Sequence, residues 1–293
     1  MMNAELENDL YLNAEREALL AARSYILPFD RQSWRGHQGS SQGQGVGNSI
    51  DFHDHRAYQY GDDPRYIHWA AYARTGQYVM KLFRAEQSPL VEICMDVSGS
   101  MELTSEKAIA GEGMLRFCLA NADRVGAPVR VYAVSGEFCR AVDVSEVRNR
   151  GWRSRIELNA RRGGMPGRIQ WRPQSMRILI SDLLYPGDPY RVLGGMSSGA
   201  GLSMIFAPWD AAESGWEVRG NVEMEDCESG EKVNRRITEE WAKRYTQAYK
   251  RHFALWEEAC IRYNVGMARV AGGKDLKSAL SEEALKFGLV EPA

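Results

Sequence analysis

An apolar strand that ends in a turn of oxygen-bearing side chains most constrains the fold of this chain. The stretch Val91–Met101 reads Val-Glu-Ile-Cys-Met-Asp-Val-Ser-Gly-Ser-Met. A short apolar run suits a strand that is covered on both faces, and Gly99 allows the chain to bend sharply. We therefore expect Asp96, Ser98 and Ser100 at the carboxyl end of a parallel strand, the edge at which open α/β sheets bind ligands.

Three oxygen donors on one turn are typical of a site for a hard cation. Ligands that are all oxygen favour magnesium or manganese over zinc. The alternative is an Asp/Ser-rich turn that only caps the following helix. The three residues by themselves leave both interpretations open.

Strand and helix patterns alternate after residue 78 and predict an α/β fold. Strands are expected over residues 78–83, 90–95, 129–134, 138–142, 176–180 and 202–206, and helices over residues 105–125, 188–197 and 235–263, with a final strand and helix after them. This order predicts a doubly wound, mainly parallel sheet with helices on both faces. It also places Asp182 at a strand end next to that of Asp96.

The first 88 residues are expected to form an N-terminal extension to this domain. Residues 3–26 carry apolar side chains at helical spacing, and residues 36–47 are rich in Gly, Ser and Gln. We place the boundaries at 1–88 for the extension and at 89–288 for the α/β domain.

Charge and cysteine usage argue against a nucleic-acid-binding protein, a disulfide-stabilised protein and a zinc-motif protein. The formal net charge of −2 gives no general attraction to nucleic acid. Five widely spaced cysteines form no disulfide framework or zinc motif, which favours a reducing cytoplasm. The first thirty residues contain no uninterrupted apolar stretch, so we expect no membrane span.

Two motifs resemble the metal-ion-dependent adhesion site of von Willebrand factor A domains. They are Asp96-Val-Ser98-Gly-Ser100 and the strand end Ile180-Ser181-Asp182-Leu183. The resemblance implies that Mg²⁺ or Mn²⁺ is held by Asp96, Ser98, Ser100 and Asp182 and bridges to an Asp or Glu of a partner protein. That family also uses a threonine after a pair of glycines, but Gly163-Gly164-Met165-Pro166 carries methionine there. A thioether is a poor ligand for magnesium, so we expect a partly degenerate site.

The residues before the first motif resemble the domain of unknown function 58 family. The resemblance is carried by Phe52-x-x-x-Arg56-x-Tyr58-x-x-Gly61-Asp62-Asp63-Pro64-Arg65-x-Ile67-x-Trp69 and by Ala73-Arg74-Thr75-Gly76. Asp226-Cys-Glu228-Ser-Gly230-Glu231 is also similar to this family. Its members are von Willebrand A-like proteins typically encoded beside MoxR-type AAA+ ATPases. The resemblance therefore implies such an ATPase as a partner.

The charged residues of this signature have two interpretations. Arginine can hold a carboxylate bidentately, so the set can be an ion-pair network that pins the extension to the sheet. The alternative is a docking surface for a partner. The set consists of Arg56, Asp62, Asp63, Arg65 and Arg74.

Together these patterns predict a non-enzymatic protein-interaction adaptor. One alternative is a scaffold that has lost the cation and binds through shape and the Arg/Asp patch. The other is a hydrolase that uses the strand-end cleft, since Gly195-Met-Ser197-Ser-Gly199 matches Gly-x-Ser-x-Gly. That match does not follow a strand, as a nucleophile elbow requires, so we expect no catalysis.

Overall fold

The chain folds into two compact units. The computed structural model describes residues 4–29, 52–83, 90–149, 152–156, 164, 166, 169–215 and 218–293. One unit consists of Met1–Arg35 together with Pro89–Ala293, and the other is Gly36–Ser88. We call them the sheet unit and the small unit. The Gly-rich segment at residues 36–47 and Met165 lie outside the described residues.

The sheet unit contains a six-stranded, mostly parallel sheet. Its strands are β4 (Val91–Asp96), β5 (Val129–Ser135), β6 (Phe138–Val142), β7 (Met176–Ile180), β8 (Leu202–Trp209) and β11 (Gly266–Ala271), in the spatial order β11-β8-β7-β4-β5-β6. Only β6 runs antiparallel to its neighbour in this sheet. The predicted mixed α/β fold is confirmed. The chain leaves β4 toward β5 and later returns to β7 on the other side, which makes the carboxyl ends of β4 and β7 a topological switch point.

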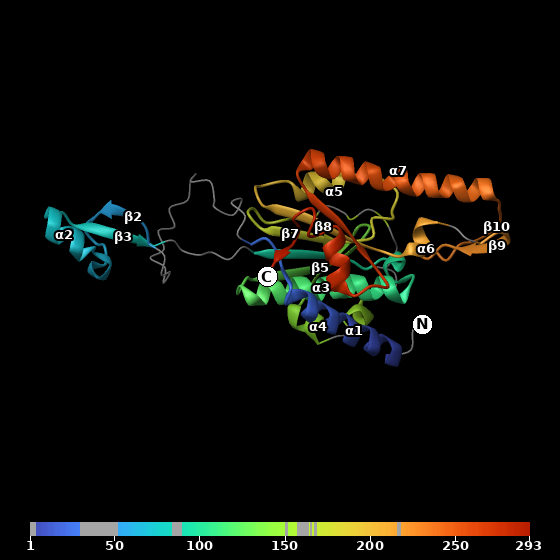
Figure 1. Ribbon diagram of the computed structural model, residues 1–293, viewed down its shortest axis with the longest axis horizontal. Helices are drawn as coiled ribbons and strands as arrows, with labels where there is room; N and C mark the ends of the chain where they lie inside the picture. The colour runs from blue at the N-terminus through green and yellow to red at the C-terminus, as the bar shows by residue number, and fades with distance from the viewer. Residues whose placement is uncertain are drawn as a thin grey trace. The chain divides into compact units, whose positions relative to one another are not determined.

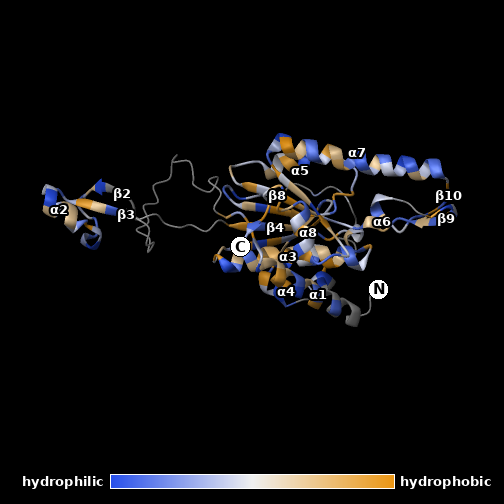
Figure 2. Cartoon of the chain, viewed as in Figure 1, coloured by the Kyte–Doolittle hydropathy of each residue, from blue (hydrophilic) through white to orange (hydrophobic). Residues whose placement is uncertain are grey.

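Helices cover both faces of this sheet (Figure 1). One face is packed by α1 (Ala4–Ala22), α3 (Ser105–Arg124), α4 (Val144–Arg148) and α8 (Leu276–Glu282), and the other by α5 (Pro189–Met196) and α7 (Glu239–Tyr263). Hydrophobic residues concentrate in the central strands (Figure 2). All six residues of β4 are buried, as expected for a parallel strand between two helical layers.

Helix α1 belongs to the sheet unit, although its place in the sequence favours grouping it with the residues up to 88. Ala14, Ala18 and Ala21 are buried, and their small side chains let α1 lie directly against α3. The Leu27 N–H donates to Asn121 Oδ1 of α3 at 3.1 Å, which ties the end of this segment to the same helix.

Shorter elements complete the sheet unit. They are β1 (Tyr25–Ile26) paired with β12 (Glu291–Pro292), the 3-10 helices η3 (Gly99–Glu102) and η4 (Arg153–Arg155), α6 (Ala211–Ser214), and the antiparallel hairpin of β9 (Gly220–Glu225) and β10 (Lys232–Ile237). The hairpin was not predicted. Because it takes up Arg235–Ile237, α7 begins at Glu239, with the Thr238 side chain accepting from the Trp241 N–H.

The small unit is a two-stranded antiparallel ribbon with a short helix. Strand β2 (Phe52–Ala57) pairs with β3 (Val79–Phe83), and η2 (Pro64–Tyr66) and α2 (Trp69–Thr75) lie between them in the chain. Among the residues of this unit whose burial the structure describes, 56–81, the buried apolar side chains are Ile67 and Met80, at 7% and 4% exposure. Within the described ranges of the chain, no helix is long and apolar enough to span a membrane.

Candidate functional site

The four predicted metal-site residues lie together at the carboxyl edge of the sheet. Asp96 ends β4, Ser98 and Ser100 lie on the turn that follows, and Asp182 follows β7. The Ser98 and Ser100 hydroxyl oxygens are 3.1 Å apart and hydrogen-bonded. The Ser181 hydroxyl donates to Asp96 Oδ2 at 2.6 Å and so ties the two strand ends together. We call residues 98–100 the serine turn.

Asp96 is a buried carboxyl group with both oxygens engaged. It is 2% exposed, and its Oδ1 accepts the Ser98 N–H at 2.9 Å. Burial, followed by the neighbouring charge of Asp182, raises the pKa of Asp96 to about 6. Its hydrogen bonds with Ser98 and Ser181 favour the ionised form and oppose the shift. Asp96 therefore holds the turn in place by accepting hydrogen bonds from the Ser98 N–H and the Ser181 hydroxyl.

Lys107 places a buried positive charge at the same edge of the sheet. It is a residue of α3, and its side chain is completely buried. Its ammonium group is 2.6 Å from Asp182 Oδ2 and also bonds Glu213 Oε1 of α6. Burial lowers the pKa of Lys107, but these two carboxylates outweigh burial and hold that pKa above its ordinary value. Burial raises the pKa of Glu213, and Lys107 opposes that rise. Lys107 thus supplies an internal cation to a cluster of buried acids.

A carboxylate is already bound to the serine turn. Glu228, from the turn between β9 and β10, accepts the Gly99 N–H at 3.1 Å through Oε2 and the Ser100 N–H at 2.8 Å through Oε1. The two hydrogen bonds are charge-assisted and use both carboxylate oxygens. The serine turn therefore presents two backbone donors in a geometry that fits one acidic side chain.

The donor set does not fit a divalent cation well. Mg²⁺ requires about six oxygen ligands near 2.0–2.1 Å, but both Asp96 oxygens accept hydrogen bonds, and Asp182 is bonded to the Lys107 ammonium and to the Leu184 N–H. Among the residues that the structure describes, no group of three His, Cys, Asp or Glu side chains could hold a metal ion. We therefore derive no step through a bound cation.

Thr104 has a structural role beside the site. Its hydroxyl caps α3 by accepting the Lys107 N–H at 3.3 Å and donates to Asp210 Oδ2 at 2.9 Å. Asp210 in turn forms a capping box with Glu213 at the start of α6. These contacts fix α3 and α6 relative to each other, and so they position the two side chains that form the Lys107–Glu213 pair.

The predicted Arg/Asp patch forms separate pairs within the small unit. Arg56 holds Asp62 bidentately at 2.8 and 2.6 Å, and Arg65 pairs with Asp63 at 2.7 Å. The Arg74 Nε donates to the Ala70 carbonyl oxygen at 3.1 Å. We expected one continuous network. The structure instead has two separate ion pairs, Arg56–Asp62 and Arg65–Asp63, and a hydrogen bond from Arg74 to the backbone of its own helix. Its two possible roles, in pinning the extension or in docking a partner, stay predictions.

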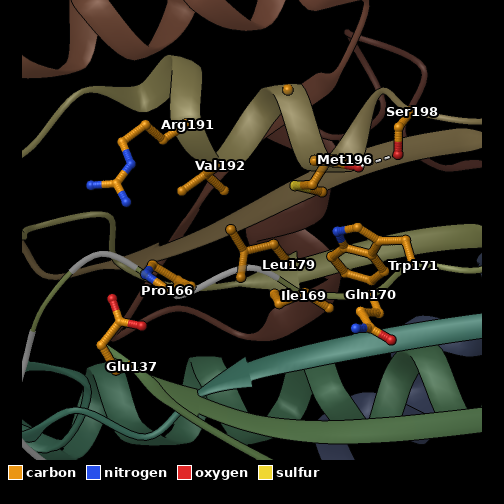
Figure 3. A pocket seen from close by; sticks show the side chains of 12 residues that line it. Glu137, Pro166, Ile169, Gln170, Trp171, Leu179, Arg191, Val192, Met196 and Ser198 are labelled. Carbon is orange, nitrogen blue, oxygen red and sulfur yellow. Dashed lines mark hydrogen bonds between the residues drawn. The ribbon is translucent and has the colours of Figure 1, made fainter.

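The motif that suggested a hydrolase lies away from the serine turn. Ser197 follows helix α5, and its hydroxyl donates to the Gly194 carbonyl oxygen. A cavity of about 680 Å³ lies beside α5 and β7 (Figure 3). Ser198 lines it and donates to the Gly195 carbonyl oxygen at 2.8 Å, and Arg191 and Glu137 lie at the other end of the view. A helix precedes the serine, so the segment is not a nucleophile elbow.

Lys107 and Glu213 were not predicted as site residues, and Glu228 was not assigned to the site. A single lysine in a helix carries no signal of burial, because lysines of helices are mostly exposed. For Glu228 a signal existed, since Asp226 and Gly230 mark a turn between two polar strands.

Comparison with known proteins gives one family match. Residues 54–129 match the family described as "Protein of unknown function DUF58". The matched range includes the Arg56–Arg74 segment and the serine turn. No curated protein matches the chain.

Solved structures resemble this chain only at low sequence identity. The conserved hypothetical protein BatB from Bacteroides thetaiotaomicron is 13% identical with a TM-score of 0.35, and the match covers 68% of this chain and 98% of that one. An aerotolerance-related membrane protein from Bacteroides fragilis is 12% identical with a TM-score of 0.34 and the same coverage of both chains.

Proposed function

We propose that this chain is a non-enzymatic interaction module of the von Willebrand factor A type that binds an acidic side chain of a partner protein. The observation that carries the proposal is the carboxylate of Glu228 on the Gly99 and Ser100 N–H groups. The site lies at the switch point of the sheet, where open α/β folds bind their ligands.

Lys107 supplies the positive charge of this site in place of a divalent cation. Its ammonium group neutralises part of the charge of Asp182 and Glu213, and it cannot leave as a metal ion can. A carboxylate that binds the serine turn then accepts hydrogen bonds from the preorganised Gly99 and Ser100 N–H groups. The negative charge of the nearby acids Asp182 and Glu213 is already partly neutralised by Lys107. The competing version is the Mg²⁺- or Mn²⁺-bridged adhesion site, in which Ser98 and Ser100 contact the cation.

The partner that the family resemblance implies is a MoxR-type AAA+ ATPase, and we propose that the chain acts with it in the cytoplasm as an adaptor. An ATPase would present or remodel the acidic partner segment. The proposal makes no use of Ser197 or of the cavity beside α5.

The experiment is capture of the purified MoxR-type ATPase on the immobilised chain, with and without EDTA. Gly99→Asp places a negative charge beside the two N–H donors and should weaken capture at least about tenfold relative to Gly99→Asn, because like charges repel at close range. Gly99→Asn is the matched control, since its Cβ meets the same Cys227 carbonyl oxygen, 2.5 Å away, without the charge. Gly215→Asp adds the same charge at a position where a side chain meets nothing within 4 Å.

Capture by wild type and by Gly215→Asp should be the same in EDTA. Equal capture by Gly99→Asp and Gly99→Asn would refute the site. Loss of wild-type capture in EDTA would favour the cation-bridged version. No capture by any form would remove the ATPase as the partner.

A further inference from the structure

The turn that carries Glu228 is organised by its own residues. We call residues 226–231 the hairpin tip. Asp226 Oδ1 accepts the N–H groups of Glu228 and Ser229 at 2.8 and 2.9 Å, and the Gly230 N–H donates to the Asp226 carbonyl oxygen at 2.8 Å. The N–H groups of Ser229 and Glu228 that donate to this carboxylate lower the pKa of Asp226 and so favour its ionised form. The tip therefore presents the Glu228 side chain as a preformed unit.

The hairpin behind the tip has little hydrophobic anchoring. Of the two six-residue strands β9 and β10, only Ile237 at the base is buried. A two-stranded hairpin without a core is marginally stable in water, and segments with few buried apolar contacts open at low free-energy cost. The contact of Glu228 with the serine turn is thus a main attachment of the tip to the sheet unit.

The tip also covers the serine turn with its backbone. A Cβ atom at Gly99 would lie 2.5 Å from the Cys227 carbonyl oxygen. The backbone φ of Gly99 is not positive, so glycine is required there by the close approach of the tip and not by its own conformation. The tip therefore fills the space that a partner segment needs in order to reach the same N–H groups.

We infer that the hairpin tip is a displaceable internal ligand, and that the partner binds by inserting an acidic turn of the same kind in place of Glu228. The inference rests on the proposed function and adds to it the chemistry of the partner segment and a competing intramolecular contact. In the closed state, Glu228 of the tip accepts the Gly99 and Ser100 N–H groups. In the open state, the tip has moved away and these N–H groups are exposed to the partner. The partner segment is a turn with a glutamate or aspartate at its tip.

Hydrogen exchange of the full chain tests the internal contact. Glu228→Gln keeps the size of the side chain and removes its charge, so the segment with Gly99 and Ser100 should exchange about tenfold faster. Glu231→Gln is the matched control, because it makes the same charge change on an exposed residue of the tip. Equal exchange in wild type and Glu228→Gln would overturn the inference.

A peptide titration tests displacement. The probe is a synthetic peptide of residues 224–233 with Cys227→Ser, followed by fluorescence anisotropy. It should bind the Glu228→Gln protein about tenfold more tightly than it binds wild type, and it should restore slow exchange at the serine turn. The same peptide with its glutamate at position 228 replaced by glutamine should bind at least about tenfold more weakly.

The outcomes separate the two claims. Equal peptide affinity for wild type and Glu228→Gln would show that the tip does not compete, so the inference would fail while the proposed acid-binding site would stand. Binding to neither protein would overturn the proposed function and the inference with it, even if the exchange result had confirmed the internal contact.

Discussion

Replacing Lys107 with methionine should destabilise the sheet unit by about 3–5 kcal/mol, the usual cost of removing one partner from a buried ion pair. Methionine retains most of the hydrocarbon stem, so the change acts mainly on the charge. Lys107 is completely buried, and its ammonium is 2.6 Å from Asp182 Oδ2 and also bonds Glu213. Without it, two buried carboxylates lose their counter-charge.

Urea unfolding followed by circular dichroism measures this loss. With a slope of about 2 kcal/mol per molar urea, the midpoint should fall by about 1.5–2.5 M. Lys243→Met is the control, because Lys243 is 71% exposed in its pair with Glu239 and such surface pairs contribute at most about 1 kcal/mol. If both variants unfolded at the same urea concentration, the role given to Lys107 would be wrong.

The pH dependence of the same difference has a defined sign. The folded-state pKa of Lys107 is raised, so its contribution is fully present below the ordinary lysine pKa of about 10.4. It is lost as the pH rises through the folded-state value. Wild type should therefore keep its advantage over Lys107→Met at neutral pH and lose it at strongly alkaline pH.

Three further predictions concern single residues. Because burial raises the pKa of Asp96 from 3.8 to about 6, wild type should lose about 2 kcal/mol of unfolding free energy between pH 4 and 7 relative to Asp96→Asn; parallel pH profiles would contradict this. Gly99→Ala should speed hydrogen exchange of the hairpin tip about tenfold because of the 2.5 Å contact with Cys227, whereas Gly215→Ala should not; equal rates would refute the steric argument. Arg56→Ala should make residues 52–83 more sensitive to protease than Arg65→Ala does, since the Arg56 side chain is 25% exposed and that of Arg65 is 82% exposed; equal digestion would argue against a structural role for Arg56.

The sheet could be predicted because its signals are local. The central strands are short apolar runs, and residues 176–180 were predicted with the same bounds that β7 has. The switch point followed from the alternation of strands and helices. The β9–β10 hairpin was missed because its strands are polar and largely exposed. Only β9 alternates apolar and polar residues, with Val222 and Met224 between polar neighbours, and β10 does not.

The site could be predicted only in part, because its unexpected members come from distant segments. Asp96 and the serine turn are adjacent in sequence, and Asp182 follows from the order of the strands. Lys107 and Glu213 meet Asp182 only through the packing of α3 and α6, and Glu228 is 128 residues from Ser100. A local pattern cannot show that a charged side chain finds its partner across the fold.

The most direct test of the central claim is a titration of the peptide of residues 224–233 into the Glu228→Gln protein, once in EDTA and once in Mg²⁺. If Lys107 and the backbone N–H groups hold the acidic side chain, the dissociation constant should be the same in both buffers. Binding that occurs only in Mg²⁺ would contradict the account and would make the serine turn a cation-dependent adhesion site.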